Sequence, residues 1–362
     1  MSTASLPISR ARVIGTGLLG TSIALGLREH AVEVDLEDSS PSRLRLAEDY
    51  GAGQAVTPAT PATPDPDLVV VATPPDVTAA VVSDAVNRFP EAVVMDVASV
   101  KNAIVESVAD TTGRFVPTHP MAGRERGGPT AARVDLFTGR PWVVCAEDSP
   151  ASGIVRQLVA ALGGFAVSMT PEEHDRAVAV LSHLPQVVSS SVAAELISAD
   201  AAWLELAGGG VRDVTRIAGS DPELWAQILE GNHAAVADVV QTVADRLSAV
   251  AGALREVDAP GSRTTLHETL RAGRDGVSAL PGKHGSAERY VTQIVVIDDQ
   301  PGQLAALLSD VGELGVNLED MSLEHSPGAP VGFVELAIAP EAAETLRDGL
   351  STKGWRVSGE AQ

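Results

Sequence analysis

The sequence is poor in cysteine, aromatic residues and positive charge, and each shortage excludes a class of protein. Cys145 is the single cysteine, so an internal disulfide and a cysteine-ligated zinc site are both excluded. Aromatic residues make up 3% of the chain, so aliphatic side chains must fill its cores. Lysine and arginine number 26 against 48 aspartates and glutamates, a formal net charge of −22. Such a surface repels phosphate backbones and anionic lipid, so we expect no nucleic-acid partner and no membrane surface.

Long uncharged segments are also scarce. Residues 13–27 follow two arginines and resemble a signal peptide, but glycines interrupt the run and no small-residue cleavage site follows. The apolar region 234–257 carries five charged residues, which is too many for a helix that spans a bilayer. We therefore expect a cytoplasmic protein, in agreement with the single cysteine.

The first part of the chain has the pattern of a parallel sheet. A length of 362 residues allows two or three domains. Short aliphatic runs alternate with helical patterns, which is typical of a sheet covered on both faces. We expect strands at residues 11–15, 32–38, 68–72, 93–96 and 142–145. This pattern predicts an α/β Rossmann-type domain over residues 1–170.

The remaining sequence divides into a helical part and a mixed part. Apolar residues at helical spacing predict an all-α domain over residues 171–285, whose last apolar stripe, at 234–257, suits a core or a second subunit. Residues 259–287 are glycine-rich and polar, and we interpret them as a linker. Residues 286–362 follow the order βαββαβ, which predicts a ferredoxin-like unit.

A glycine-rich turn joins the first predicted strand to the first helix, in the pattern G-x-G-x-x-G at residues 15–20. The first glycine permits a tight turn, the second lets backbone approach a pyrophosphate, and the third lets the helix pack closely. The helix N-terminus then offers free N–H groups to the anion. We expect cofactor contacts from this turn and from the end of a neighbouring strand, at Gly15, Gly17, Leu18, Leu19, Gly20 and Thr73.

An acidic residue at the end of the second strand distinguishes the two nicotinamide cofactors. Asp38 lies about 18 residues beyond the glycine turn, where a carboxylate accepts both ribose hydroxyls and repels a 2′-phosphate. This favours NAD over NADP. Asp35 and Glu37 are alternatives if the strand ends earlier, and Arg43 and Arg45 would suit NADP.

Polar side chains also follow the predicted strands, at the edge where parallel sheets bind ligands. Ser99 and Lys101 come after the strand at 93–96, and His119 follows an apolar pair at 115–116. A histidine in that place can act as a general base near neutral pH, or it can be a structural residue bonded to backbone. Position alone leaves both interpretations open.

Other features of the sequence do not indicate a metal or a covalent nucleophile. His174 and His183 are nine residues apart, which does not place them on one helix face, so we expect no metal site. There is no Gly-x-Ser-x-Gly elbow, and Cys145 falls in a predicted buried strand. Three glycines precede Arg212 and Arg216, a segment that suits either a carboxylate-binding loop or a surface loop.

Several motifs occur together in a characteristic order: Gly-Thr-Gly-Leu-Leu-Gly, Asp-Val-Ala-Ser-Val-Lys, Thr-His-Pro-Met-Ala-Gly-Arg-Glu, Leu-Phe-Thr-Gly-Arg, Ser-His-Leu-Pro and Arg-Asp-Val-Thr-Arg-Ile-Ala-Gly-Ser-Asp-Pro-Glu-Leu-Trp. With them, residues 10–285 resemble the prephenate/arogenate dehydrogenase family of tyrosine biosynthesis. The tail contains Asp-Gln-Pro-Gly-Gln-Leu and Gly-Val-Asn-Leu-Glu-Asp. It resembles an ACT domain, a regulatory module that often binds amino acids.

The resemblance implies a cytoplasmic homodimer that uses NAD to convert prephenate to 4-hydroxyphenylpyruvate, with the all-α domain forming the dimer. His119 would take the proton of the ring hydroxyl as hydride leaves, and Ser99 would orient that hydroxyl or His119. Arg216 would bind a substrate carboxylate, and Trp225 would approach the pocket from the second subunit. The substrate-binding residues implied are Arg216, His183, Gln186, Trp225 and Glu125. In the tail, tyrosine as an effector would bind near Gly315 and Asn317.

One residue departs from the family's pattern and leaves the substrate open. Gln186 stands where the family has a second histidine, and glutamine can donate a hydrogen bond but cannot carry charge. Arogenate, with an amino group in place of the keto oxygen, is therefore an alternative substrate. A related β-hydroxy-acid oxidoreductase and a non-catalytic sensor of NAD or amino acids are the remaining hypotheses.

Overall fold

The computed structural model describes residues 6–57, 60, 63–108, 113–123, 127–280, 290–325 and 330–361. The chain divides into two compact units. The first comprises Met1–Ala199 and Val214–Val243, and the second comprises Asp200–Asp213 and Ala244–Gln362. Every residue proposed for catalysis, cofactor or substrate belongs to the first unit, whereas Gly315 and Asn317 belong to the second.

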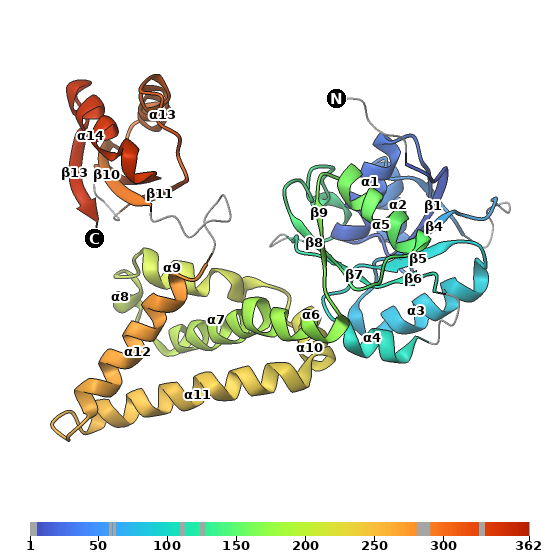
Figure 1. Ribbon diagram of the computed structural model, residues 1–362, viewed down its shortest axis with the longest axis horizontal. Helices are drawn as coiled ribbons and strands as arrows, with labels where there is room; N and C mark the ends of the chain where they lie inside the picture. Colours follow the sequence, from blue (N-terminus) through green and yellow to red (C-terminus); the bar gives the residue numbers. More distant parts are fainter. Residues whose placement is uncertain are drawn as a thin grey trace. The chain divides into compact units, whose positions relative to one another are not determined.

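The first unit begins with a six-stranded parallel sheet in the order β3-β2-β1-β4-β5-β6 (Figure 1). Its strands are β1 (Arg10–Ile14), β2 (Glu33–Glu37), β3 (Gln54–Ala55), β4 (Leu68–Val71), β5 (Val93–Asp96) and β6 (Phe115–Val116). The helices among them are α1 (Leu18–Glu29), α2 (Pro41–Asp49), α3 (Pro75–Arg88) and α4 (Asn102–Ser107). The strand order reverses between β1 and β4, which confirms the predicted Rossmann-type α/β domain.

The core of this domain is aliphatic, as the shortage of aromatics requires. All four residues of β4 are fully buried, and their branched side chains suit a strand that is covered on both faces. On one face of the sheet, Val13 and Val70 pack with Ile23 and Leu27 of α1. Burial of each such side chain contributes about 1.5–3 kcal/mol, so this layer holds the glycine turn firmly against the sheet.

A smaller sheet follows and carries His119. It consists of β7 (Thr118–Pro120), β8 (Pro141–Val144) and β9 (Phe165–Ser168), with η1 (Pro129–Ala131) and α5 (Pro150–Ala161) in the connections. The N–H of Thr118 donates to Oδ1 of Asp96 at 3.1 Å, and the indole N–H of Trp142 donates to Oγ1 of Thr118 at 2.9 Å. These bonds fix β7, and with it His119, beside the end of β5.

The middle of the chain is helical, as predicted. The elements there are α6 (Pro171–Val178), a π-helical turn (Ala179–His183), α7 (Leu184–Glu195), η3 (Leu196–Ser198), α8 (Ala201–Leu204), α9 (Gly209–Thr215), η4 (Arg216–Gly219), α10 (Pro222–Gly231), α11 (His233–Arg255) and α12 (Ser262–Val277). The glycine-rich segment before Arg216 is therefore helical and not a loop. The linker expected at 259–287 is wrong over α12, because glycine lowers helix stability by only about 1 kcal/mol per residue and the surrounding residues outweigh it.

The C-terminal elements form a four-stranded antiparallel sheet in the order β11-β12-β10-β13. They are β10 (Val291–Asp298), α13 (Gln303–Glu313), β11 (Asp320–His325), β12 (Val331–Ile338), η5 (Pro340–Ala342), α14 (Ala343–Thr352) and β13 (Arg356–Ala361). Leu307 of α13 and Leu346 of α14 pack on Val295 and Leu336 of the sheet. The βαββαβ order matches the predicted ferredoxin-like unit.

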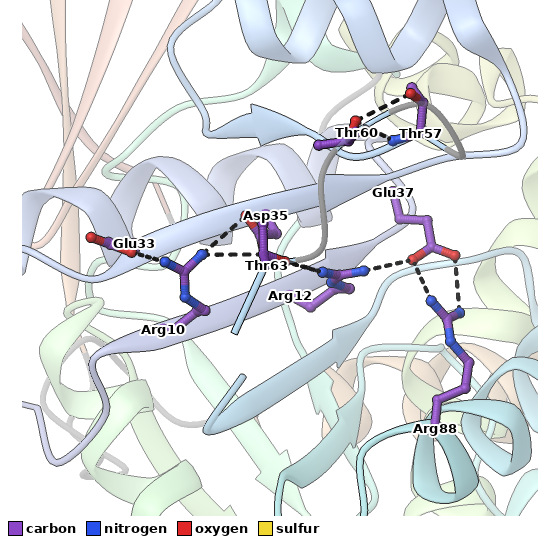
Figure 2. A network of polar contacts seen from close by, with 9 residues as sticks. All are labelled: Arg10, Arg12, Glu33, Asp35, Glu37, Thr57, Thr60, Thr63 and Arg88. Carbon is purple, nitrogen blue, oxygen red and sulfur yellow. Dashed lines mark hydrogen bonds and ion pairs between the residues drawn. The ribbon is translucent and has the colours of Figure 1, made fainter. Parts of the chain in front are cut away.

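A ladder of ion pairs covers one face of β1 and β2 (Figure 2). Side chains two apart on a strand share a face, so the two arginines of β1 meet the alternate acids of β2. Asp35 is 1% exposed and lies 3.1 Å from Arg12 and 3.3 Å from Arg10. Glu37 accepts two bonds from Arg88 at 3.1 Å. Both acids are committed to the fold, which removes Asp35 in particular as a ribose ligand.

Within the described residues, one helical stretch is long and apolar enough to cross a membrane, judged by length and composition alone. Pro171–Ser198 has a mean hydropathy of 1.4 over its most apolar window, of which 28% is buried. The helix nevertheless carries buried polar residues that turn toward the protein interior, among them His174, His183 and Gln186.

Candidate active site

The glycine turn is built as its sequence predicts. Gly15 adopts φ +99°, and a Cβ there would lie 2.3 Å from the carbonyl oxygen of Ala72. A Cβ on Gly20 would lie 1.9 Å from the carbonyl oxygen of Gly15, so only glycine lets α1 approach the turn. Gly17 faces open space and is the N-cap of α1 with no side-chain cap. Open space above uncapped helix N–H groups is what a pyrophosphate requires, so these residues fit NAD.

Asp38 lies directly beyond β2 and is hydrogen-bonded to the same turn. Its Oδ2 accepts the backbone N–H and the hydroxyl of Thr16 at 2.7 and 2.8 Å, and its Oδ1 accepts the N–H of Ser40 at 2.7 Å. Thr73 follows β4, beside Gly15, and its hydroxyl lies 3.1 Å from that of Thr78. Asp38, Thr73 and the turn thus line the carboxyl edge of neighbouring strands.

A fully buried ion pair lies at the end of β5. Lys101 and Asp96 are both 0% exposed, and the ammonium group donates to Oδ2 of the carboxylate. Asp96 also accepts the N–H of Ala98 at 3.0 Å, in addition to that of Thr118. The pair fixes the loop that carries Ser99, which is partly buried two residues before Lys101.

His119 lies at this edge with two further polar residues, His174 and Asp175. Nδ1 of His119 is 2.8 Å from Nε2 of His174, and Nδ1 of His174 is 2.7 Å from Oδ1 of Asp175. All three residues are at least nine-tenths buried. Burial lowers the pKa of His119 well below its usual value, and the neighbouring basic groups of His174, Lys101 and His183 lower it further. The ring is therefore neutral at pH 7, as a proton acceptor must be.

His183 reaches the same region because of the π-helical turn. Nine α-helical residues rotate by about 900°, which would set His174 and His183 on opposite faces. The wider π turn at Ala179–His183 rotates less per residue and changes the phase of the helix. Nδ1 of His183 is consequently 3.2 Å from Nδ2 of Asn232, which also donates to the backbone oxygen of Asp175 at 2.7 Å.

The remaining residues assigned to substrate lie on α7, η4 and α10. Gln186 is buried on α7, one turn beyond His183, and Nε2 of Gln186 is 3.4 Å from Oγ of Ser190. Arg216 begins η4, which lies beside α7, and is exposed. Trp225 packs edge-on against His183 of the same chain, with ring centroids 6.0 Å apart. The contact brings Trp225 to this site within one chain, and its expected approach to the pocket of a second subunit stays a prediction.

Sequence reasoning missed part of this cluster, and some of its assignments are not tested. His174 and Asp175 received no catalytic role, since neither follows a strand or a recognised motif. Glu125 lies outside the described residues. No group of three or more metal-binding side chains occurs within the described part of the chain, so the metal-free expectation stays a prediction. Burial raises the pKa of the Cys145 thiol to about 12, so that residue is not a nucleophile at neutral pH.

The clash at Gly20 gives a first testable prediction. Gly20→Ala should weaken NAD⁺ binding by about tenfold or more, because the new methyl group must displace the carbonyl oxygen of Gly15 and the turn with it. Titration calorimetry with NAD⁺ measures the change. Gly153→Ala is the matched control, since a Cβ on this α5 glycine meets nothing within 4 Å. Equal NAD⁺ affinity of wild type and Gly20→Ala would show that the turn does not hold the cofactor.

The buried His183 gives a second prediction, on stability against pH. Burial lowers its pKa to about 4, whereas the unfolded chain has an ordinary histidine that titrates near 6.5. Between these values the unfolded state binds a proton that the folded state lacks, so the free energy of unfolding falls as pH falls. Across the window we expect a loss on the order of 3 kcal/mol.

The measurement is urea unfolding at several pH values between 7.5 and 4, for wild type and for His183→Gln. The variant should lose less stability than wild type over this range. His267→Gln, at an exposed position on α12, should behave as wild type. Parallel curves for wild type and His183→Gln would contradict the buried, neutral state of this ring.

Comparisons with known proteins agree with this geometry. Residues 23–169 match the family model of the prephenate dehydrogenase nucleotide-binding domain, and residues 170–272 match that of the prephenate dehydrogenase dimerization domain. A probable prephenate dehydrogenase of Streptomyces niveus is 36% identical over 95% of this chain and 98% of its own length.

Two solved structures are also similar. Prephenate dehydrogenase from A. aeolicus, in complex with hydroxyphenyl propionate and NAD⁺, is 25% identical with a TM-score of 0.65, over 76% of this chain and 100% of its own. Synechocystis arogenate dehydrogenase is 26% identical with a TM-score of 0.58, over 74% of this chain and 99% of its own. The two family models match residues 23–272, and the Streptomyces niveus relative is 36% identical over 95% of the chain. This chain therefore belongs to the prephenate dehydrogenase family.

Proposed function

We propose that this chain is an NAD-dependent prephenate dehydrogenase of tyrosine biosynthesis, which converts prephenate to 4-hydroxyphenylpyruvate. One observation carries the proposal: a buried, neutral His119 stands at the same sheet edge as a glycine turn shaped for a dinucleotide. The 36% identity with the Streptomyces niveus protein over almost the whole chain supports the same activity.

The glycine turn, the N-terminus of α1, Asp38 and Thr73 would hold the cofactor. When bound, NAD⁺ supplies the acceptor for the hydride. Asp38 would accept ribose hydroxyls with the lone pairs that its bonds to Thr16 and Ser40 leave over. A carboxylate there repels a 2′-phosphate, and the cofactor named in the A. aeolicus complex is NAD⁺.

In the reaction, His119 accepts one proton and later returns it. It accepts the proton of the ring hydroxyl as the C–H electron pair of the same carbon leaves as hydride. The bond between the ring and its carboxylate breaks, CO₂ departs, and the electron pair completes the aromatic ring. His119 returns its proton to the phenol oxygen, so the base ends the cycle neutral. Ser99 would orient the hydroxyl or His119.

Prephenate carries two carboxylates, and a chain with a net charge of −22 must provide local positive charge for them. Arg216, at the start of η4 beside α7, is the residue we assign to one carboxylate. His183, Gln186 and Trp225 would line the rest of the pocket, with Glu125 near its mouth.

Arg216→Ala should raise KM for the substrate by about tenfold or more and change kcat little, because it removes binding that is uniform along the reaction. Steady-state kinetics at saturating NAD⁺ measure both parameters. Arg212→Ala, one helical turn earlier and also exposed, is the control. An unchanged KM in Arg216→Ala would assign the carboxylate to another cation.

Arogenate is the second candidate substrate, and Gln186 is the residue that keeps it open. A buried amide can accept a hydrogen bond from an ammonium group as readily as it can donate one to a keto oxygen. Synechocystis arogenate dehydrogenase has nearly the same sequence identity to this chain as the A. aeolicus enzyme, 26% against 25%, although its TM-score is lower, 0.58 against 0.65. Prephenate and arogenate, each with NAD⁺ and NADP⁺, should be compared by kcat/KM. We expect the highest value for prephenate with NAD⁺, and a higher value for arogenate would reverse the assignment.

We further propose a homodimer in the cytoplasm, formed through the helical domain. Large apolar side chains there are exposed, including Leu181 at 66%, Ile197 at 89% and Leu247 at 60%. Exposed apolar surface on this scale is typical of a subunit interface. The match to a dimerization-domain model over residues 170–272 supports the same conclusion.

For the tail we propose an ACT-like regulatory domain that binds tyrosine. The boundaries proposed for the three domains are 1–170, 171–285 and 286–362, and residues 1, 285, 286 and 362 lie outside the described residues. Gly315 adopts φ +70°, and the amide of Asn317 donates to Glu319 at 2.9 Å. Titration calorimetry with tyrosine tests this proposal, and absence of both binding and inhibition would leave the unit a structural one.

A further inference from the structure

The three residues His119, His174 and Asp175 form a continuous hydrogen-bonded chain that ends at a carboxylate. Nδ1 of His119 lies 2.8 Å from Nε2 of His174, and Nδ1 of His174 lies 2.7 Å from Oδ1 of Asp175. The imidazole rings of His119 and His174 meet edge to face, with centroids 5.1 Å apart. Two ring nitrogens in contact can hold one proton between them, so one ring donates and the other accepts. Which group donates and which accepts in these two hydrogen bonds decides which nitrogen of His119 is free to act as a base.

Asp175 fixes the direction. Its Oδ1 accepts the backbone N–H of Lys101 at 2.9 Å, and its Oδ2 accepts that of Asn102 at 2.8 Å. Burial raises its pKa, but the bonds from His174 and from these N–H groups outweigh it and hold the pKa below its usual value. An ionised carboxylate only accepts, so Nδ1 of His174 must be the donor.

The protonation of the remaining ring nitrogens follows from that bond. A neutral His174 that is protonated at Nδ1 has a lone pair at Nε2, and the nearest donor to that lone pair is Nδ1 of His119. A neutral His119 protonated at Nδ1 keeps its own lone pair at Nε2.

We propose that His174 and Asp175 are positioning residues that hold His119 in its Nδ1–H tautomer, so that Nε2 faces the substrate hydroxyl as the base. This inference rests on the proposed function for the identity of the substrate. The geometry of the three side chains does not depend on it. When the hydroxyl O–H bond breaks and the Nε2–H bond forms, the cation on His119 keeps its bond to His174, and Asp175 supplies the compensating charge on the far side of the His174 ring.

A spectrum of the full-length protein tests the tautomer without any substrate. Long-range ¹H–¹⁵N correlation of histidine-labelled protein distinguishes protonated from unprotonated ring nitrogens, and the His119→Asn variant assigns the ring. We expect His119 to show protonated Nδ1 and unprotonated Nε2 at pH 7.5. An Nε2–H or doubly protonated ring would overturn the proposal, whatever the substrate is.

The Asp175→Asn variant tests whether the carboxylate sets the tautomer of His119. An asparagine amide can donate to Nδ1 of His174, which reverses both bonds and leaves His119 protonated at Nε2. We expect this reversal in the spectrum and a fall in kcat of about 10²–10⁴-fold with little change in KM. Asp67→Asn is the matched control, since Asp67 also accepts two backbone N–H groups, at 2.7 and 3.0 Å, but contacts no histidine.

The outcomes separate this inference from the proposed function. Asp175→Asn with an unchanged tautomer and full turnover overturns the inference while the enzyme stays a dehydrogenase. The expected tautomer in a protein that oxidises neither prephenate nor arogenate overturns the function and leaves the inference standing. If Asp175→Asn does not fold, the wild-type spectrum decides.

Discussion

His119→Asn is expected to lower kcat for prephenate by about 10²–10⁴-fold, the contribution typical of a general base. Asparagine keeps a group that can donate to His174 but has no nitrogen lone pair for the substrate proton. Because the ring is buried and neutral, its loss should affect the chemical step more than substrate or NAD⁺ binding. Steady-state kinetics with prephenate and NAD⁺ provide the measurement.

The control for this variant is His267→Asn, which changes an exposed histidine on α12. NAD⁺ affinity and thermal unfolding should be the same in wild type and in both variants. A His119→Asn enzyme with turnover within a few-fold of wild type would remove this residue from the mechanism and leave its burial as a structural matter.

Lys101→Ala should reduce the free energy of unfolding by about 3–5 kcal/mol, because it leaves the Asp96 carboxylate buried without its counter-charge. Both side chains are 0% exposed, so water cannot take the place of the ammonium group. Lys101→Met should be destabilised to a similar extent, since it keeps the volume and removes only the charge. The double variant with Asp96→Asn should recover part of the loss.

Urea unfolding of the full chain measures these changes. Arg133→Ala is the control, because its ion pair with Asp135 has side chains 57% and 59% exposed, so its loss should change stability far less than the loss of the buried pair. A loss below about 1 kcal/mol in Lys101→Ala would show that the buried pair does not stabilise this end of β5.

The features that the sequence predicts well are local ones. The fully buried β4 appears in the sequence as an unbroken aliphatic run, and the glycine turn as a fixed spacing between strand and helix. His119 is a candidate because it follows a strand, at an edge where parallel sheets place their ligands, and the family resemblance supplies its role as the base. In each case neighbours along the chain determine the structure.

The features that the sequence did not predict depend on distant contacts. Asp175 is 74 residues from Lys101 and His174 is 55 residues from His119, so no spacing rule brings them together. The π turn at Ala179–His183 changes the helix phase by an amount that 3.6-residue periodicity does not contain. The contact of Trp225 with His183 depends in the same way on how α10 packs, which no local pattern contains.

The central claim is that a neutral His119 and NAD⁺ together oxidise and decarboxylate prephenate, and the stoichiometry of the reaction tests it most directly. Wild-type protein should be mixed with a limiting amount of prephenate and excess NAD⁺, with NADH followed by absorbance, CO₂ trapped and the organic product identified. We predict equal amounts of NADH, CO₂ and 4-hydroxyphenylpyruvate, formed far more slowly by His119→Asn. Prephenate recovered intact, or NADH formed without CO₂, would contradict the account.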